Sequence, residues 1–276
     1  SGQLISSTAA NGHSTSFSTP GSDGLSPSEV VELWRELIDL HDQVKSARIM
    51  CEGALELRKV AGSGGIPDGR NQVVTEFLAS DREWLFMVDS DMGFDADTVD
   101  RLVDSADEHK RPVMGGLCFA NRRLGPGEFH AERFGSVPTL YNYVELEDEV
   151  GFMPIQDYPR DTVVEVAGTG AACLLIHRRA LGKVREKFGD SWFDPIAHPT
   201  GLKGKPRTFS EDLSFCVRLA SVGVPVFVDT SVRTCHEKGG VFLTEEHYDR
   251  EQTLAAFEAA AAAESAADEP VSSSAA

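Results

Sequence analysis

The sequence lacks long apolar runs, and this absence bears on where the protein works. No apolar stretch approaches the roughly 18 residues that a membrane-spanning helix needs. The first residues also lack the basic segment and the apolar stretch of a secretory signal. We therefore expect a cytoplasmic protein without integral membrane association. Apolar residues still make up 41% of the 276 residues, which is enough for one sizeable core.

Basic side chains are scarce as well. Lysine and arginine number 26 against 44 aspartates and glutamates, so the formal net charge is -18. Sequence-independent binding to nucleic acid depends on clustered lysines and arginines, and a strongly acidic protein repels a polyanion. The charge therefore disfavours DNA as a partner, although a local basic patch around Arg122, Arg123 and Arg133 leaves that partner open.

Cysteines are few and show no metal-binding spacing. The five cysteines are Cys51, Cys118, Cys173, Cys216 and Cys235, an odd number without a C-x-x-C pair. A secreted disulfide framework normally pairs its cysteines, and a structural zinc site needs closely spaced ones. Reduced cysteines in the core of a cytoplasmic protein are the better interpretation.

Apolar periodicity predicts strands that alternate with helices, which is typical of an α/β protein. We expect its sheet to be mainly parallel in the first half. The expected strands span residues 3–9, 49–60, 84–88, 112–117, 163–166, 171–176, 224–228 and 231–235. The expected helices span residues 28–44, 69–80, a segment capped by Asp95, 178–188, a segment capped by Ser210, and 245–263. Residues 125–160 are compatible with antiparallel strands or with a lid-like loop.

Two further expectations concern organisation. Residues 1–243 form one domain, and residues 244–276 form an alanine-rich helix followed by an acidic disordered tail. The helix capped by Ser210 should bury one face at helical spacing. That face consists of Leu213, Cys216, Val217 and Ala220.

The strongest chemical feature is Asp89-Ser90-Asp91, which directly follows the apolar strand over residues 84–88. Ligands of open α/β sheets gather at the carboxyl ends of the strands. Two carboxylates two residues apart beyond such an end can converge on one hard cation, and oxygen ligands suit Mg²⁺ or Mn²⁺. A turn with two solvated acids is the alternative.

Four segments, in order along the chain, resemble the GT-A fold glycosyltransferases, family 2-like enzymes of the small bacterial and bacteriophage type. The segments are GIPDGRNQVV, WLFMVDSDMGFDADTVDRLV, VAGTGAACLLIHRRAL and FSEDLSFCVRLASVGVPVFVDTSVRTCH. Their joint order is more specific than any single motif. The resemblance implies a single Rossmann-like mixed sheet flanked by helices, and the host cytoplasm as the location if the chain is viral.

The resemblance also implies a divalent cation, Mn²⁺ or Mg²⁺, and a nucleoside-diphosphate sugar as donor, with UDP-sugars favoured. Asp91 is then the direct metal ligand, Asp89 touches the metal or the ribose, and His236 completes the shell. The cation neutralises the growing negative charge of the leaving diphosphate. For His236 taken alone, a surface histidine in a turn is the alternative.

Further donor contacts follow from the same resemblance. Arg70 and Asn71 pair with the pyrophosphate and the ribose, where an arginine gives a bidentate grip. The segment Gly168-Thr169-Gly170 forms a glycine loop, where the absence of side chains lets the sugar approach the backbone closely. Thr169 hydrogen-bonds a sugar hydroxyl. A plain helix start and a tight turn are the alternatives for these two segments. The full donor set is Thr8, Ala9, Arg70, Asn71, Asp89, Ser90, Gly168, Thr169 and Gly170.

For catalysis, the resemblance assigns Asp212 as the base and Glu211 as the residue that orients the acceptor. Direct displacement with inversion needs a base to take the proton of the acceptor hydroxyl. A position in the first turn of a helix stabilises ionised Asp212, but acids at a helix start are also ordinary capping residues. Trp192, Phe193 and Asp194 resemble an acceptor-side aromatic patch, with a core tryptophan as the alternative.

The expected function is therefore metal-dependent sugar transfer to an acceptor hydroxyl by a hexosyltransferase-type enzyme. The acceptor is left open among a protein, a glycan, a lipid-linked sugar and a hydroxylated DNA base. One alternative is a haloacid dehalogenase-like phosphatase with Asp89 as nucleophile, although Met92-Gly93 is unusual after such a motif. Another is a non-catalytic nucleotide-sugar binding protein, which needs the Asp-x-Asp pair but not Asp212.

Overall fold

The computed structural model describes residues 3–8, 13–15, 49–50, 55–57, 59–61, 65–126, 132–145, 150–199, 206–238 and 240–267. Ala9, Cys51, the helix expected over residues 28–44 and the tail after Ala267 lie outside the described residues. The expectations for these segments stay predictions.

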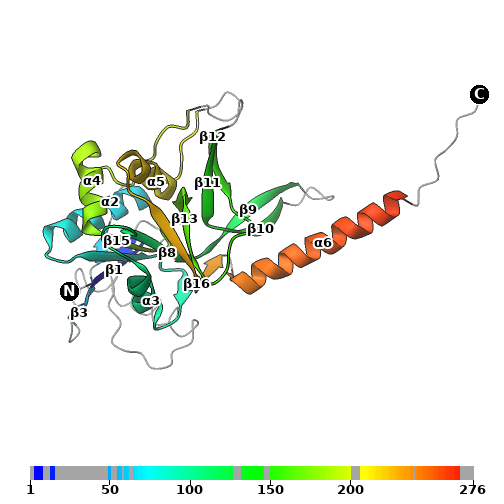
Figure 1. Cartoon of the computed structure of the whole chain (residues 1–276), viewed down its shortest axis with the longest axis horizontal. Coiled ribbons are helices and arrows are strands. Elements are labelled where there is room, and N and C mark those ends of the chain that lie inside the picture. Colours follow the sequence, from blue (N-terminus) through cyan, green and yellow to red (C-terminus); the bar gives the residue numbers. More distant parts are fainter. Residues whose placement is uncertain are drawn as a thin grey trace, which may run out of the picture.

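The described residues form a mixed α/β fold around a 12-stranded sheet of mixed direction (Figure 1). The main path of this sheet runs β13-β16-β8-β15-β6-β1-β2-β5. Its strands are β1 (Gln3–Thr8), β2 (His13–Thr15), β3 (Ile49–Met50), β4 (Leu55–Leu57), β5 (Lys59–Ala61), β6 (Trp84–Val88), β7 (Met92–Phe94), β8 (Val113–Leu117), β13 (Val163–Val166), β15 (Cys173–His177), β16 (Val226–Lys238) and β17 (Val241–Leu243). An α/β fold with a mixed sheet is thus confirmed.

The middle of the sheet contains parallel pairs separated by one reversed strand. β1 lies parallel to β6 and β16 lies parallel to β8, whereas β15 runs antiparallel to both β6 and β8. Strands β6 and β8 therefore point the same way and end at the same edge of the sheet. Asp89 is the first residue after β6 at that edge.

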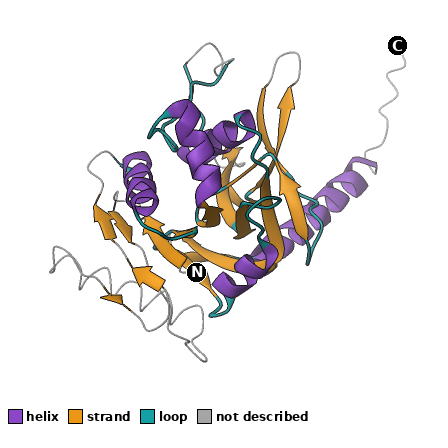
Figure 2. Ribbon diagram, turned by 60° about the vertical axis from the view of Figure 1, so that its left-hand side comes forward, coloured by secondary structure: helices purple, strands orange, loops and turns teal. Residues whose placement is uncertain are grey.

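Four of the five described helices cover the two faces of this sheet (Figure 2). Residues of α2, α4 and α5 pack with Leu85 and Met87 on one face of β6, whereas α3 packs with Phe86 and Val88 on the other. A strand buried on both faces needs a continuous apolar run, which explains the composition of β6. The helices are α2 (Ile66–Ala79), α3 (Thr98–Ser105), α4 (Arg178–Phe188), α5 (Glu211–Ser221) and α6 (Glu245–Ala267).

Two helix expectations need correction. Helix α3 begins at Thr98 with Asp97 as its N-cap, because Asp95 lies in a preceding turn whose carbonyl accepts the Thr98 N–H. Helix α5 does follow Ser210, but it is rotated from the expected face. Its buried residues are Ser214, Phe215, Cys216, Arg218 and Leu219.

The rotation of α5 has a packing reason. Phe215 stacks on Phe193 at a centroid distance of 4.5 Å, so the larger aromatic side chain takes the inward position. Arg218 donates to the carbonyl of Asp194 at 2.6 Å. Val217 and Ala220 consequently lie on the outer side of the helix, where they line a pocket.

The described strand pairs formed within the second half of the chain are antiparallel. The two strands expected over 224–228 and 231–235 are one long strand, β16. Residues 125–160 form antiparallel strands instead of a lid-like loop over their described part. The strands β9 (Phe119–Pro126) and β10 (Glu132–Pro138) make one sheet, and β11 (Leu140–Glu145), β12 (Val150–Pro154) and β14 (Gly168–Thr169) make another.

Helix α6 extends away from the body of the protein (Figure 1). Its first turns are held by Glu251, which accepts from the backbone N–H of Ser136 at 2.7 Å. Beyond them, Leu254 and Phe257 are exposed. Among the described helices, none combines the length and the apolar character that a membrane crossing requires.

Candidate active site at the end of strand β6

Arg70 connects two of the predicted site segments. This arginine lies in α2, whose first turn carries Pro67, and its side chain is 4% exposed. One guanidinium nitrogen donates to Asp89 Oδ1 at 2.9 Å, and the other donates to the carbonyl of Ala171 at 2.9 Å. Its Nε lies 3.9 Å from Glu211 Oε1. Arg70 therefore joins the end of β6 to the start of α5.

The half-buried carboxylate of Asp89 has a raised pKa. Burial raises the pKa of Asp89 to about 6, although the Arg70 guanidinium opposes this rise. The negative charge of Asp91 adds to it, because two neighbouring carboxylates disfavour each other's ionisation. A cation at this edge of the sheet would favour ionised Asp89.

Asp91 has two partners from β16. Lys238 Nζ donates to Asp91 Oδ2 at 2.6 Å, and His236 Nε2 lies 3.4 Å from the same oxygen. Burial favours the neutral acid, but His236 and Lys238 outweigh it and lower the pKa of Asp91 to about 2. For His236 itself, burial lowers the pKa and the Asp91 carboxylate raises it, with a net rise. Asp91 is thus an anion that already attracts cations.

His236 is a buried strand residue and not the surface histidine of a turn. It lies within β16, is 7% exposed, and its Nδ1 is 2.9 Å from the carbonyl oxygen of Phe119. Its Nε2 is buried and has no hydrogen-bond partner. In metal-binding histidines one ring nitrogen is usually held by a backbone carbonyl or a carboxylate, as Nδ1 of His236 is held by Phe119.

The predicted metal ligands lie near one another but do not form a complete coordination shell. Within the described part of the chain, no three histidine, cysteine, aspartate or glutamate side chains converge closely enough to hold a metal ion. Asp91 and His236 do face each other, and the free Nε2 suits a borderline cation such as Mn²⁺. Asp91 and His236 are therefore two donors of the kinds that a divalent cation binds, and Lys238 pairs with the same Asp91 oxygen.

Glu211 and Asp212 occupy the first turn of α5, as expected. Burial raises the pKa of Glu211, and the charge of Asp212 adds to this effect. A Cβ placed on Gly170 would lie 3.6 Å from Asp212 Oδ2, so the missing side chain leaves space beside that carboxylate. Asp212 also accepts a hydrogen bond from Ser210. Asp212 and Gly170 are thus neighbours at the start of α5.

The other two members of the glycine loop have structural roles. A Cβ on Gly168 would meet Phe152 Cε1 at 2.7 Å and Leu213 Cδ2 at 3.1 Å. Glycine is therefore needed there for the approach of an aromatic ring. Thr169 is 2% exposed, so its hydroxyl does not face an open site.

Several predicted residues lie elsewhere. Asn71 donates to Asp194 Oδ1 at 2.6 Å and accepts from the N–H of Phe193 at 2.8 Å, so its amide fixes a neighbouring loop. The aromatic patch proposed for the acceptor is wrong, because Trp192 and Phe193 are fully buried in the core. Their rings fill the space under α5 and α4, where a sugar cannot reach.

Two more residues predicted for the donor site, Ser90 and Thr8, lie near Asp89. Ser90 is half-buried between the two aspartates. Thr8 ends β1, whose residue Ser6 pairs with Met87 of β6. The parallel register therefore brings Thr8 to the same edge of the sheet as Asp89.

Sequence reasoning missed Lys238. This lysine ends β16 and donates a hydrogen bond to Asp91. The period of two along a strand places His236 and Lys238 on the same face, and that spacing was the available signal.

Comparisons with known proteins assign no family. Neither a scan against protein families nor a search of the curated proteins finds a match. Among solved structures, 21 chains match. One is described as the crystal structure of A197 from STIV, with 15% sequence identity, 90% of this chain and 92% of that chain covered, and a TM-score of 0.42. A likeness this remote carries no argument about function.

Proposed function

We propose that this protein is a metal-dependent glycosyltransferase of the GT-A fold, which moves a sugar from a nucleoside-diphosphate donor to an acceptor hydroxyl with inversion. One observation carries the proposal. Arg70 joins Asp89, after a central strand, to Glu211, at the start of α5, and Asp91 faces the free Nε2 of His236. Carboxylates, an imidazole and an arginine at the carboxyl end of parallel strands suit a diphosphate and its cation.

In this proposal, each residue has a separate role. Asp91 and His236 would hold the cation, which would neutralise the negative charge of the leaving diphosphate. Asp212 takes the proton of the acceptor hydroxyl as the acceptor oxygen bonds to the anomeric carbon. The bond from that carbon to the diphosphate oxygen breaks at the same time, and the diphosphate leaves with the electron pair.

The two alternatives receive less support. A phosphatase nucleophile must reach its substrate freely, whereas Asp89 Oδ1 is held by Arg70. A non-catalytic binding protein has no need for a carboxylate beside Gly170, where Asp212 lies. The DNA acceptor remains disfavoured by the charge of -18.

The test separates donor binding from transfer. Binding of UDP, GDP and their sugars is measured by calorimetry with and without Mn²⁺, and turnover of the bound donor is then followed. We expect Asp212→Asn to reduce turnover by about 100- to 10,000-fold, since a base contributes that much, while nucleotide affinity stays within about twofold. Asp91→Ala should abolish the Mn²⁺-dependent part of nucleotide binding.

The control is Asp190→Asn, which removes a surface carboxylate paired with Arg185. It should match the unmodified protein in both measurements. Equal turnover by Asp212→Asn and the unmodified chain would overturn the proposed base, and an absence of nucleotide binding under all conditions would overturn the proposed function.

A further inference from the structure

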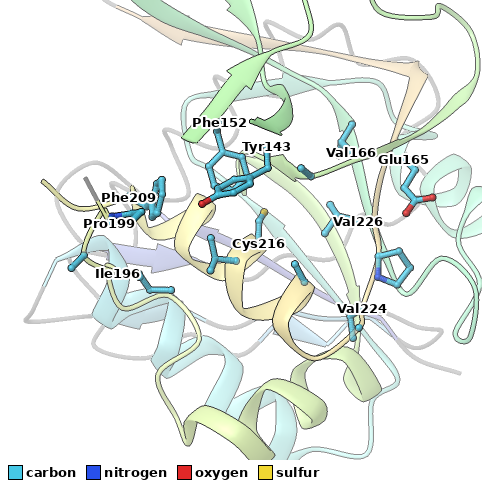
Figure 3. Close-up of a pocket in the computed structure, with 16 residues that line it drawn as sticks. Tyr143, Phe152, Glu165, Val166, Ile196, Pro199, Phe209, Cys216, Val224 and Val226 are labelled. Carbon is cyan, nitrogen blue, oxygen red and sulfur yellow. The ribbon is translucent and has the colours of Figure 1, made fainter. Parts of the chain in front are cut away.

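A large apolar pocket lies along the outer side of α5 (Figure 3). Its volume is about 730 Å³, within the range of about 300–1,000 Å³ that is usual for small-molecule sites. Cys216, Val217 and Ala220 of α5 form one wall, and Val166 and Val226 of the neighbouring strands form another. We call this space the apolar pocket. Its composition suits a ligand part without polar groups.

A second pocket of about 520 Å³ adjoins the apolar pocket. Phe152 and Phe209 line both, and their rings meet edge to face at a centroid distance of 5.6 Å. The second pocket also receives Asn121, His198 and Arg207. No carboxylate is present among the described residues that line it. Its hydrogen-bonding groups and its cation suit a hydroxyl-rich or anionic head.

The second pocket lies next to the start of α5, where the proposed catalytic base is found. Leu213, which lines it, directly follows Asp212. The ring of Phe152 lies against Gly168, which precedes Gly170 by two residues, or about 7 Å of extended chain. Gly170 in turn borders Asp212 Oδ2. The two pockets therefore meet at the aromatic pair, and the described lining of the second pocket ends at Leu213, one residue from the carboxylate that is to receive the proton.

We propose that the acceptor is a free amphiphile, with an apolar chain or ring in the apolar pocket and a hydroxyl-bearing head in the second pocket beside Asp212. The proposal rests on the proposed function and narrows its acceptor class. A free molecule suits the charges better than a lipid within a bilayer. The protein carries a net charge of -18, and the one charged side chain in the described lining of the apolar pocket is exposed Glu165. An anionic membrane surface would repel both.

Butyl, hexyl and octyl glucosides are suitable probes, used below their micelle concentrations. Their affinities are measured by calorimetry without donor, so the result does not depend on transfer. Each methylene buried in the apolar pocket should tighten Kd by about fourfold, the equivalent of about 0.8 kcal/mol. An affinity that does not change with chain length would overturn the proposal.

Two variants locate the binding. Ala220→Phe places a ring in the apolar pocket from an exposed helix position, and Val217→Asp introduces a carboxylate there. Both should remove the dependence of Kd on chain length. The control Ala255→Phe makes the same change on the exposed side of α6 and should leave it intact. Unchanged chain-length dependence in both pocket variants would overturn the proposal.

The outcomes also separate this inference from the proposed function. If the protein binds nucleotide but its affinity for the glucosides does not change with chain length, the amphiphilic acceptor is rejected and the proposed function is not. If glucoside affinity rises with chain length but no nucleotide binds, the apolar pocket is supported as a ligand site and the proposed function is rejected. Co-sedimentation of the protein with phosphatidylglycerol vesicles, together with a flat glucoside series, would overturn the free acceptor in favour of a bilayer lipid.

Discussion

Helix α5 borders two regions of opposite character, one charged and one apolar. Its first turn faces a charged edge, the group formed by Arg70, Asp89, Asp91, Glu211 and His236, where each charged side chain is placed by a partner of opposite sign. Its outer side lines the apolar pocket, whose described lining is mostly apolar and carries one charged side chain, Glu165. Buried charges hold a defined geometry only when they are paired, whereas an apolar wall tolerates many ligand positions. We therefore expect stringent recognition at the charged edge and broader recognition in the apolar pocket.

The largest effect on stability is expected at Arg70. Arg70→Met keeps much of the side-chain volume but leaves Asp89 without its buried partner. Breaking such a pair costs about 3–5 kcal/mol because an uncompensated carboxylate remains. Urea unfolding monitored by circular dichroism measures the change in the free energy of unfolding.

The control for that prediction is Arg185→Met. Arg185 pairs with Asp190 at the surface, at 2.8 Å, with both side chains about half exposed. Such pairs contribute about 0–1 kcal/mol. Similar losses in both variants would contradict the view that the charged edge is held by its buried pair.

A smaller effect is expected where the aromatic pair packs on the glycine loop. Gly168→Ala brings a methyl group within 2.7 Å of the Phe152 ring, which has to shift. Overpacking of this kind costs about 1–3 kcal/mol. The same shift should weaken binding of octyl glucoside, which tests whether Phe152 shapes the pockets.

Gly182→Ala is the matched substitution. Gly182 lies within α4, and a Cβ placed on it meets no atom within 4 Å. Alanine should therefore stabilise the protein by up to about 1 kcal/mol through helix propensity. If the melting temperatures of both glycine variants shift in the same direction, the close approach of Phe152 to Gly168 has no effect on the stability of the protein.

The smallest effect is a difference in pH dependence within the charged edge. Asp91 has a folded-state pKa of about 2, below its ordinary value of 3.8, so its stabilising contribution is present above about pH 4 and is lost as the pH falls toward 2. Asp89 has a folded-state pKa of about 6, so its ionisation opposes folding at neutral pH, and this cost disappears as the pH falls through 6 toward 3.8. The apolar pocket should contribute no comparable dependence.

Melting temperatures from pH 7.5 to pH 3 test this difference. The destabilisation caused by Asp91→Asn should persist to about pH 4 and shrink below it. The corresponding control is Asp190→Asn, whose carboxylate is half exposed. An Asp91→Asn effect that is already lost at pH 6 would contradict the low pKa of Asp91.

The part of the site that could be predicted from the sequence is the part encoded in contiguous residues. Asp89 and Asp91 follow an apolar strand, and Glu211 and Asp212 begin a helix, because strand ends and helix starts are local signals. The burial of α5 was not predictable in this way. Periodicity allows either Leu213 or Phe215 to face the core. Phe215 faces it because its ring stacks on Phe193, a contact between residues far apart in the sequence.

By itself, the sequence determined the alternation of strands and helices, the apolar strand β6, and the acidic pairs at its end and at the start of α5. These follow from periodicity and capping, which act over a few residues. Only the tertiary structure decided that Arg70 joins Asp89 to Glu211, that Lys238 binds Asp91, and that two pockets meet at Phe152. Those contacts link residues 19 to 147 positions apart, and the packing that brings them together is specified by the whole chain.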